Sequence, residues 1–202
     1  MIKPIPHSSL NNKTPPSSKV LCEMTQLALA ESANMIARQS KSDIQFAVNS
    51  ISVEPQQTID QMFEQEQAEM LAIRHKVNGD RPGVIVFMLS EPAAQLLLQQ
   101  LLNGGSLLSE LTEMDEEALS EVGNIIVNNC LNHYVQIFNE SVATSLPELI
   151  HRQHGQLLLD LYDETAETSA YVVKIDILLR HQTAHAYILW LGHLCQLDAG
   201  HA

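Results

Sequence analysis

The sequence predicts an α/β domain of the α+β kind, spanning residues 19–192, in which two long helices pack on a mostly antiparallel sheet. Three observations lead to this prediction. Helix-forming residues dominate two long segments, apolar segments typical of strands follow each of them, and the two halves of the 202-residue chain resemble one another. LALAESANMIARQ aligns with EALSEVGNIIVNN at an offset of 90 residues, and Pro55 and Pro147 are offset by 92. A single repeat of this kind predicts pseudo-two-fold symmetry.

The first half of the predicted domain covers residues 19–89. It follows a segment, residues 1–18, that holds four of the eight prolines and is expected to be a flexible leader. The elements expected here are a helix at 19–40, a strand at 43–55, and strands at 69–77 and 82–89 joined by a turn at 78–83. The first strand is expected to break near Asn49 and to end at Pro55. The acidic segment Ile59–Met70 is expected to be an exposed loop or strand edge.

A shorter helix, residues 91–103, joins this half to the second, which covers 110–192 and precedes a predicted tail at 193–202. The second long helix begins at Thr112 and Asp115, which are spaced as in a capping box, and its acidic first turn suits the helix dipole. The elements expected here are the long helix at 111–138 and strands at 155–163, 169–179 and 184–191.

The charge of the chain narrows the class of partner. Lys and Arg number 11 against 24 Asp and Glu, a formal net charge of −13, so nucleic acid and anionic membrane surfaces are excluded as expected partners. A protein with a basic rim around its own site fits better. The three cysteines, Cys22, Cys130 and Cys195, are scattered, and no apolar run is long enough to span a membrane. We therefore expect a soluble cytoplasmic protein with reduced thiols.

Four polar residues form a stripe along the second long helix, which is otherwise largely apolar. At about 100° per residue, Glu117, Glu121, Asn124 and Asn128 fall within a sector of about 60°. Most such stripes are simply solvated faces. This one, however, contains no Lys, and Asn is a poor residue inside a helix because its side chain competes for backbone hydrogen bonds. The same Glu-x-x-Asn pattern also recurs at the equivalent place in the first half.

A Glu and an Asn on one helical face can serve a defined chemistry. The carboxylate can pair with a cation, and the carboxamide can donate and accept hydrogen bonds at once. Such a carboxamide can hold a water molecule in line with a phosphorus atom, and phosphoryl transfer needs little beyond positioning and charge balance.

These residues resemble the CheC-type chemotaxis phosphatases, a family that includes CheX and FliY. The family signature is Asp or Ser, three residues, Glu, two residues, Asn, then 22 residues and Pro; Glu121, Asn124 and Pro147 match it, with 22 residues between Asn124 and Pro147. The segments GVIVFMLSEPAAQLLLQQLL and MDEEALSEVGNII also resemble the strand–helix–helix passage of that family. The likeness covers about residues 19 to 192.

The resemblance implies removal of phosphate from the aspartyl phosphate of a CheY-like response regulator. It implies that Glu121 pairs with a lysine in the regulator's active site and that Asn124 orients the attacking water. The Mg²⁺ would belong to the regulator, so no metal or other cofactor is expected on this chain. A CheD-like protein is a further candidate partner.

The sequence also departs from the signature. Glu117 stands where the family has Asp or Ser. In the first half, Glu31 and Asn34 form a second candidate site, but Leu27 stands at the first signature position and 20 residues, not 22, separate Asn34 from the next proline. Arg38 on the same face could repel a lysine of the regulator. The pair Glu121 and Asn124 is therefore favoured, and the first-half pair is either a weaker site or a relic of duplication.

Other readings stay open beside the phosphatase. The chain could be a non-catalytic adaptor that binds the phosphorylated regulator, as flagellar-switch relatives do, or a diverged domain that has lost both roles. An exposed sheet edge could pair two copies into a homodimer. Two close histidine pairs, His151 with His154 and His181 with His185, lie in expected strand or loop positions where neither spacing predicts a metal site.

Overall fold

The computed structural model describes residues 18–192, apart from gaps at 41–42, 65–68, 81, 103, 105–106, 139–140, 166–167 and 180. The predicted tail and, except for Ser18, the predicted leader lie outside the described residues. The elements are α1 (Ser18–Ser40), β1 (Gln45–Pro55), α2 (Gln56–Glu64), β2 (Glu69–Gly79), β3 (Gly83–Ser90), α3 (Glu91–Leu102), the 3₁₀ turn η1 (Leu108–Glu110), α4 (Glu113–Phe138), β4 (Val142–Thr144), β5 (Glu148–Gln153), α5 (His154–Thr165), β6 (Ser169–Leu179) and β7 (Gln182–Gly192). Among the described helices, none combines the length and the apolar character needed to cross a membrane.

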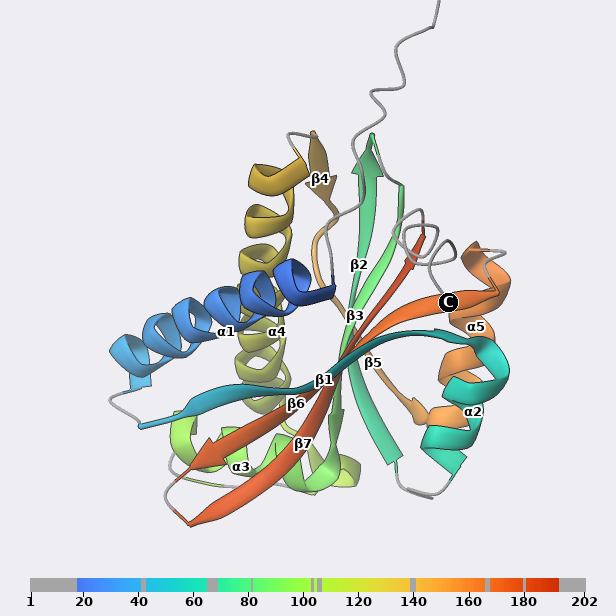
Figure 1. The fold of residues 1–202 in the computed structure, drawn as a ribbon. Helices are drawn as coiled ribbons and strands as arrows, with labels where there is room; N and C mark the ends of the chain where they lie inside the picture. The colour runs from blue at the N-terminus through green and yellow to red at the C-terminus, as the bar shows by residue number, and fades with distance from the viewer. Residues whose placement is uncertain are drawn as a thin grey trace, which may run out of the picture.

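The strands form one antiparallel sheet in the order β1-β6-β7-β3-β2-β4, with β5 also paired to β2 (Figure 1). Each half of the chain has a long helix, a strand segment, a short helix and two final strands. The final strands of the two halves, β3 and β7, are neighbours at the centre, while β1 and β5 lie at equivalent places outside β6 and β2. The predicted fold class, with its pseudo-two-fold arrangement, is confirmed.

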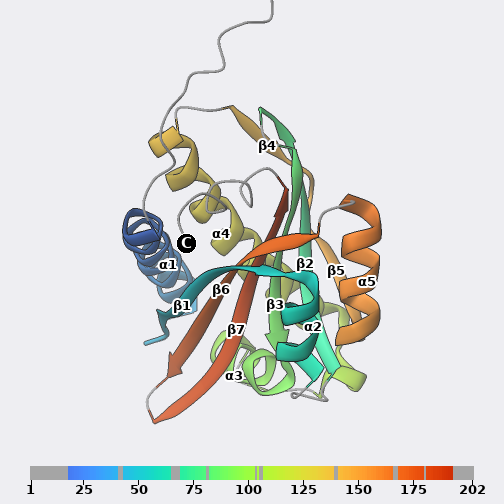
Figure 2. The same ribbon diagram turned by 45° about the vertical axis from the view of Figure 1, so that its right-hand side comes forward.

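Helices cover both faces of the sheet. The long helices α1 and α4, with α3, pack on one face, and the short helices α2 and α5 pack on the other (Figure 2). Strand β3 is apolar throughout because both of its faces are buried. Ile85, Phe87 and Leu89 face the first core, beneath α1, α3 and α4, and Val84, Val86 and Met88 face the second core, beneath α2 and α5. A strand buried on both faces needs no alternation of polar and apolar residues.

Two predictions about the second face are wrong. Residues 155–163, expected to be a strand, lie within α5, and much of the segment Ile59–Met70, expected to be exposed, belongs to α2. Ile59 and Phe63 of α2 are fully buried. The buried residues follow helical spacing, namely Ile59 and Phe63 in α2 and Leu157, Leu158, Leu161 and Tyr162 in α5. The short helices contact each other and bury the second core, which an exposed loop in this place would have left open to water.

Gly123 allows α4 to lie close against the sheet. A Cβ atom at this position would come within 2.7 Å of the Cβ atom of Ile73 on β2 and within 2.9 Å of both its branch carbons. Ile73 is fully buried, and its branch at Cβ leaves it few alternative rotamers. A glycine between two members of the polar stripe, Glu121 and Asn124, therefore sets how near the stripe lies to β2.

We expect Gly123→Ala to lower the free energy of unfolding by about 1–2 kcal/mol, because overpacking a tight contact outweighs the gain in helix propensity of at most about 1 kcal/mol. Urea unfolding of the two proteins measures the change. Gly104→Ala is the matched control, since Gly104 has no atom within 4 Å of its added Cβ, and it should stay within about 0.5 kcal/mol of the parent. An unchanged or higher stability of Gly123→Ala would contradict the close contact.

Candidate functional site

The position of the polar stripe depends on where α4 begins. The backbone N–H and the hydroxyl of Thr112 donate to Asp115 Oδ2 at 2.9 and 2.7 Å, and the backbone N–H of Asp115 donates back to Thr112 Oγ1 at 3.3 Å. These reciprocal bonds satisfy N–H groups that the first turn leaves unpaired, as the capping-box spacing predicted. They set the start of the helix and, with it, which residues face outward.

The predicted stripe lies on the outer side of α4. Leu119, Val122, Ile126 and Cys130 are buried against the rest of the molecule, whereas Glu117 and Glu121 are exposed and Asn124 and Asn128 are half-buried. The two carboxylates therefore meet solvent, and the two carboxamides lie at the edge of the packed interior. In this order the stripe presents charge first and neutral hydrogen-bonding groups one or two turns later.

The carboxamide of Asn124 is held by its neighbours. Asn128 Nδ2 donates to Asn124 Oδ1 at 2.7 Å, and the Thr144 hydroxyl donates to Asn128 Oδ1 at 3.3 Å. The chain of bonds runs from the last residue of β4 to the candidate catalytic amide. Neither β4 nor Thr144 was predicted from the sequence, because a three-residue strand carries too little pattern to be recognised.

Pro147, the last residue of the signature, lies half-buried between β4 and β5. The backbone just before it is tied to β2: the N–H of Ser145 donates to the Lys76 carbonyl at 2.9 Å, and the N–H of Lys76 donates to Ser145 Oγ at 3.0 Å. Leu146, between the anchored Ser145 and Pro147, is 87% exposed. The segment thus holds an apolar side chain in water two residues after Thr144, which bonds Asn128.

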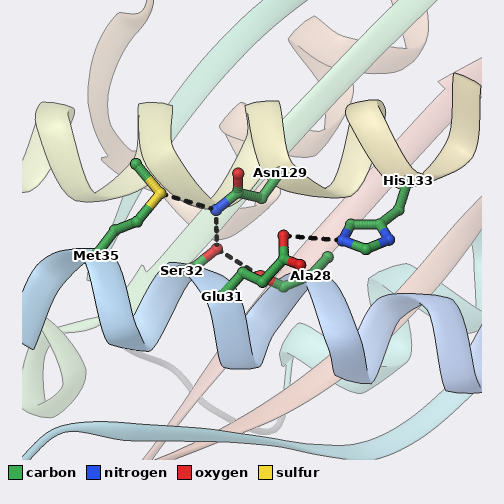
Figure 3. Close-up of polar contacts among 6 residues, drawn as sticks. All are labelled: Ala28, Glu31, Ser32, Met35, Asn129 and His133. Atoms are coloured by element: carbon green, nitrogen blue, oxygen red, sulfur yellow. Dashed lines mark hydrogen bonds and ion pairs between the residues drawn. The ribbon is translucent and has the colours of Figure 1, made fainter. Parts of the chain in front are cut away.

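The second candidate site is arranged differently. His133 Nε2 of α4 lies 3.0 Å from Glu31 Oε2 of α1, and Asn129 Nδ2 donates to Ser32 Oγ at 3.0 Å (Figure 3). Figure 3 shows both contacts bridging the two long helices, so Glu31 takes part in helix packing. Asn34 is exposed and lines an open groove of about 740 Å³ between α1 and the start of β1.

The equivalent residues of the two halves therefore have different surroundings. Glu121 and Glu31 are both exposed, but Glu31 also contacts a histidine of the other long helix, His133. Asn124 is bonded to a second carboxamide, whereas Asn34 faces the groove. Arg38, which was expected to weaken the first-half site, is exposed in the last turn of α1.

His75 of β2 contacts the segment between β4 and β5. Its side chain on β2 is fully buried, and its Nδ1 lies 3.2 Å from the Ser145 carbonyl oxygen. Burial lowers the pKa of His75 below 6.5, and the hydrogen bond with Ser145 opposes this only in part. The neutral imidazole is therefore the form that fits beneath the β4–β5 segment.

This pKa predicts a pH dependence of stability. Below pH 6.5 the unfolded chain takes up a proton on His75 more readily than the folded one, so stability is full above 6.5 and falls as the pH drops towards the lower, folded pKa. His75 alone contributes a slope of at most about 1.4 kcal/mol per pH unit. Urea unfolding at several pH values should show a shallower slope for His75→Gln than for the parent. His181→Gln, at an exposed position, controls for the loss of a histidine, and equal slopes for the parent and His75→Gln would contradict the assignment.

Of the remaining histidine candidates, two lie on strands, while His154 begins α5 and His181 lies in the turn before β7. His151 lies on β5, and His185 Nδ1 on β7 pairs with Asp176 Oδ1 at 2.8 Å. Within the described residues, no three or more His, Cys, Asp or Glu side chains are grouped so that they could hold a metal ion.

Comparison with known proteins identifies the fold. No protein-family model and no curated protein matches the sequence. Among solved structures, FliY from Thermotoga maritima is similar with a TM-score of 0.74 at 15% identity, over 92% of this chain and 94% of that one. The FliM middle domain from H. pylori is similar with a TM-score of 0.62 at 10% identity, over 87% and 94%. A chain of the CheX–CheY–BeF₃–Mg²⁺ complex from Borrelia burgdorferi is similar with a TM-score of 0.53 at 13% identity, over 82% and 96%.

Proposed function

Because this chain has the fold of the CheC, CheX and FliY chemotaxis proteins, we propose that it dephosphorylates the aspartyl phosphate of a CheY-like response regulator, with Glu121 and Asn124 as the catalytic pair. One observation carries the proposal: α4 presents an exposed carboxylate and a held carboxamide three residues apart on its outer side. The similarity of the fold that carries this pair to FliY and to a chain of the CheX–CheY complex supports the choice of reaction.

The reaction divides the work between two proteins. Glu121 pairs with the regulator's active-site lysine and sets the orientation of docking. Asn124 enters the phosphorylation site and orients a water molecule whose oxygen attacks phosphorus. The bond between phosphorus and the aspartyl oxygen breaks, the aspartate leaves as a carboxylate, and the protons of the water pass to the phosphate and to solvent. The Mg²⁺ is the regulator's, so this chain supplies no metal ligand.

The surface around the pair suits a protein partner with a basic site. Glu117 and Glu121 supply negative charge in a chain of net charge −13, which favours approach of a basic rim. Met114 lies near the start of α4 and is 64% exposed, and Leu146 is 87% exposed. Apolar side chains near a polar centre provide the contact area that a docking surface needs. The similarity to a CheX chain from a complex with CheY supports the same class of partner.

A second candidate function is that of an adaptor that binds a regulator or a flagellar switch protein without hydrolysis. The observation in its favour is the degree of structural similarity: the FliM middle domain matches with a TM-score of 0.62, against 0.53 for the CheX chain. The contact of Glu31 with His133 supports Glu121 and Asn124 as the only interacting pair in either case, since the first-half carboxylate, although exposed, already has a partner within the chain.

Turnover separates the two functions. The loss of aspartyl phosphate from a purified CheY-like regulator is followed with this protein present at much less than one molecule per regulator. A phosphatase clears the whole pool faster than the regulator does alone. An adaptor leaves the rate unchanged at this ratio, and binds the phosphorylated form when the two proteins are mixed in equal amounts. If the protein neither accelerates the loss of phosphate nor binds the phosphorylated regulator, the proposed function is overturned.

A further inference from the structure

Asn128 and Thr144 connect Asn124 to the edge of the sheet through two hydrogen bonds of defined direction. Thr144 Oγ1 donates to Asn128 Oδ1, and Asn128 Nδ2 donates to Asn124 Oδ1. We propose that Asn128, held by Thr144, is a positioning residue that determines which end of the Asn124 carboxamide faces the regulator. This inference rests on the proposed function and specifies how its catalytic amide is oriented.

The orientation of a carboxamide is not set by its own torsion. The two ends of the group differ chemically, one being an acceptor and the other carrying two N–H donors, while rotation about the terminal bond has broad minima about half a turn apart. An isolated Asn on a helix surface therefore populates both orientations. In this structure the oxygen of Asn124 is bonded to Asn128, which leaves the second lone pair of that oxygen and the N–H donors for a ligand.

This polarity suits hydrolysis of an acyl phosphate. The second lone pair of Asn124 Oδ1 can accept a proton of the attacking water and so direct the water's own lone pair at phosphorus. The N–H donors of the same group can face a phosphoryl oxygen, where negative charge collects. The flipped carboxamide would instead present its oxygen to the phosphoryl group, and the two acceptors would repel each other.

The burial of Asn124 and Asn128 and the pairing of β4 with β2 stabilise these hydrogen bonds. Asn124 and Asn128 are both half-buried, so water competes less for their hydrogen bonds than it would on a fully exposed face. Thr144 ends β4, which pairs with Val77, Asn78 and Gly79 of β2, and the next residue is hydrogen-bonded to Lys76. The chain of bonds therefore ends on the sheet, and the orientation of Asn124 is tied through Thr144 to the backbone of β2.

Two substitutions test the proposal without removing Asn124. Asn128→Asp keeps the shape but replaces the donor facing Asn124 with an acceptor, which drives the carboxamide of Asn124 to flip. Thr144→Val removes the donor to Asn128 and adds no charge, and Thr144→Ser restores the hydroxyl. Asn129→Asp is the matched control for the added charge, because Asn129 is adjacent on α4 but donates to Ser32 on α1.

The readout is the dephosphorylation of the regulator by each full-length variant, with kcat and KM determined separately. We expect Asn128→Asp to lower kcat by roughly tenfold, Thr144→Val to lower it a few-fold, and KM to change by less than about twofold, as for the loss of one or two orienting hydrogen bonds. Thr144→Ser should recover most of the parental kcat, and Asn129→Asp should keep it. Parental kcat in both Asn128→Asp and Thr144→Val, in an assay where Asn124→Ala is inactive, would overturn the inference and leave the proposed function standing.

A second measurement does not depend on activity. The NMR signals of the Asn124 side-chain amide report its hydrogen bonding in the free protein. We expect them to move in Asn128→Asp and Thr144→Val but not in Asn129→Asp. Unchanged signals would overturn the inference by themselves. Moved signals in a protein that hydrolyses nothing would support the orientation of Asn124 and refute the proposed function.

Discussion

Asn124→Ala is expected to lower the kcat for dephosphorylation of a CheY-like regulator by about a hundredfold, because a water molecule that is no longer oriented rarely attacks in line. The variant should fold normally. Asn124 is half-buried at the outer side of α4, and alanine has a higher helix propensity than asparagine by at most about 0.7 kcal/mol. Steady-state kinetics measure the loss, and urea unfolding checks that stability is kept.

Asn34→Ala is the matched control for this prediction. Asn34 occupies the equivalent place in the first half, but it faces the groove beside β1, and its companion Glu31 contacts His133. The control should keep the parental kcat within about twofold, in line with a residue outside the reaction. Full activity in Asn124→Ala, or equal losses in both variants, would contradict the assignment of a single catalytic asparagine.

Glu121→Lys is expected to raise the KM for the phosphorylated regulator by at least about tenfold, because it sets a positive charge against the regulator's lysine. Two unit charges about 4 Å apart interact with about 1 kcal/mol in bulk water and about 4 kcal/mol near a protein surface, so replacing attraction by repulsion changes binding strongly. Glu121→Gln should fall between the parent and the lysine variant. Kinetics at low and high salt measure the effect, which should shrink as salt screens the charges.

The control for Glu121→Lys makes the same charge change elsewhere. Glu23 is exposed on α1 and makes only a weak pair with Lys19, at 3.9 Å between two solvated side chains. Glu23→Lys alters the net charge by the same amount and should leave KM within about twofold, apart from a small long-range effect. Equal increases in KM for both variants would show that net charge, and not contact by Glu121, governs association.

Much of the fold could be predicted because its main elements carry strong local patterns. The long helices have helix formers over many turns, and α4 has a capping pair at Thr112 and Asp115. The break predicted near Asn49 is a bulge between Val48 and Ser50. The short helices α2 and α5 could not be recognised, for two different reasons. The α5 segment carries an apolar run whose length suits strand and helix equally, whereas the α2 segment is largely polar and acidic and has few apolar residues to mark a buried face.

The candidate site was predictable in part for a similar reason. Glu121 and Asn124 stand out because a polar stripe in a largely buried helix breaks the local pattern. Gly123 was a further signal, since glycine within a helix lowers stability by about 1 kcal/mol relative to alanine and usually has a packing reason. The contacts of Thr144 with Asn128 and of His133 with Glu31 join residues 16 and 102 positions apart, and these depend on how the elements pack.

We propose that the stripe on α4 enters the phosphorylation site of a regulator. Replacing the Mg²⁺ of a beryllofluoride-activated CheY-like regulator with paramagnetic Mn²⁺ tests it directly, because the ion broadens the NMR signals of nearby groups. In the complex with this protein, the side-chain amide signals of Asn124 and Asn128 are expected to broaden strongly while those of Asn34 stay sharp, compared with the Mg²⁺ sample. Broadening confined to α1, or to no part of α4, would contradict it.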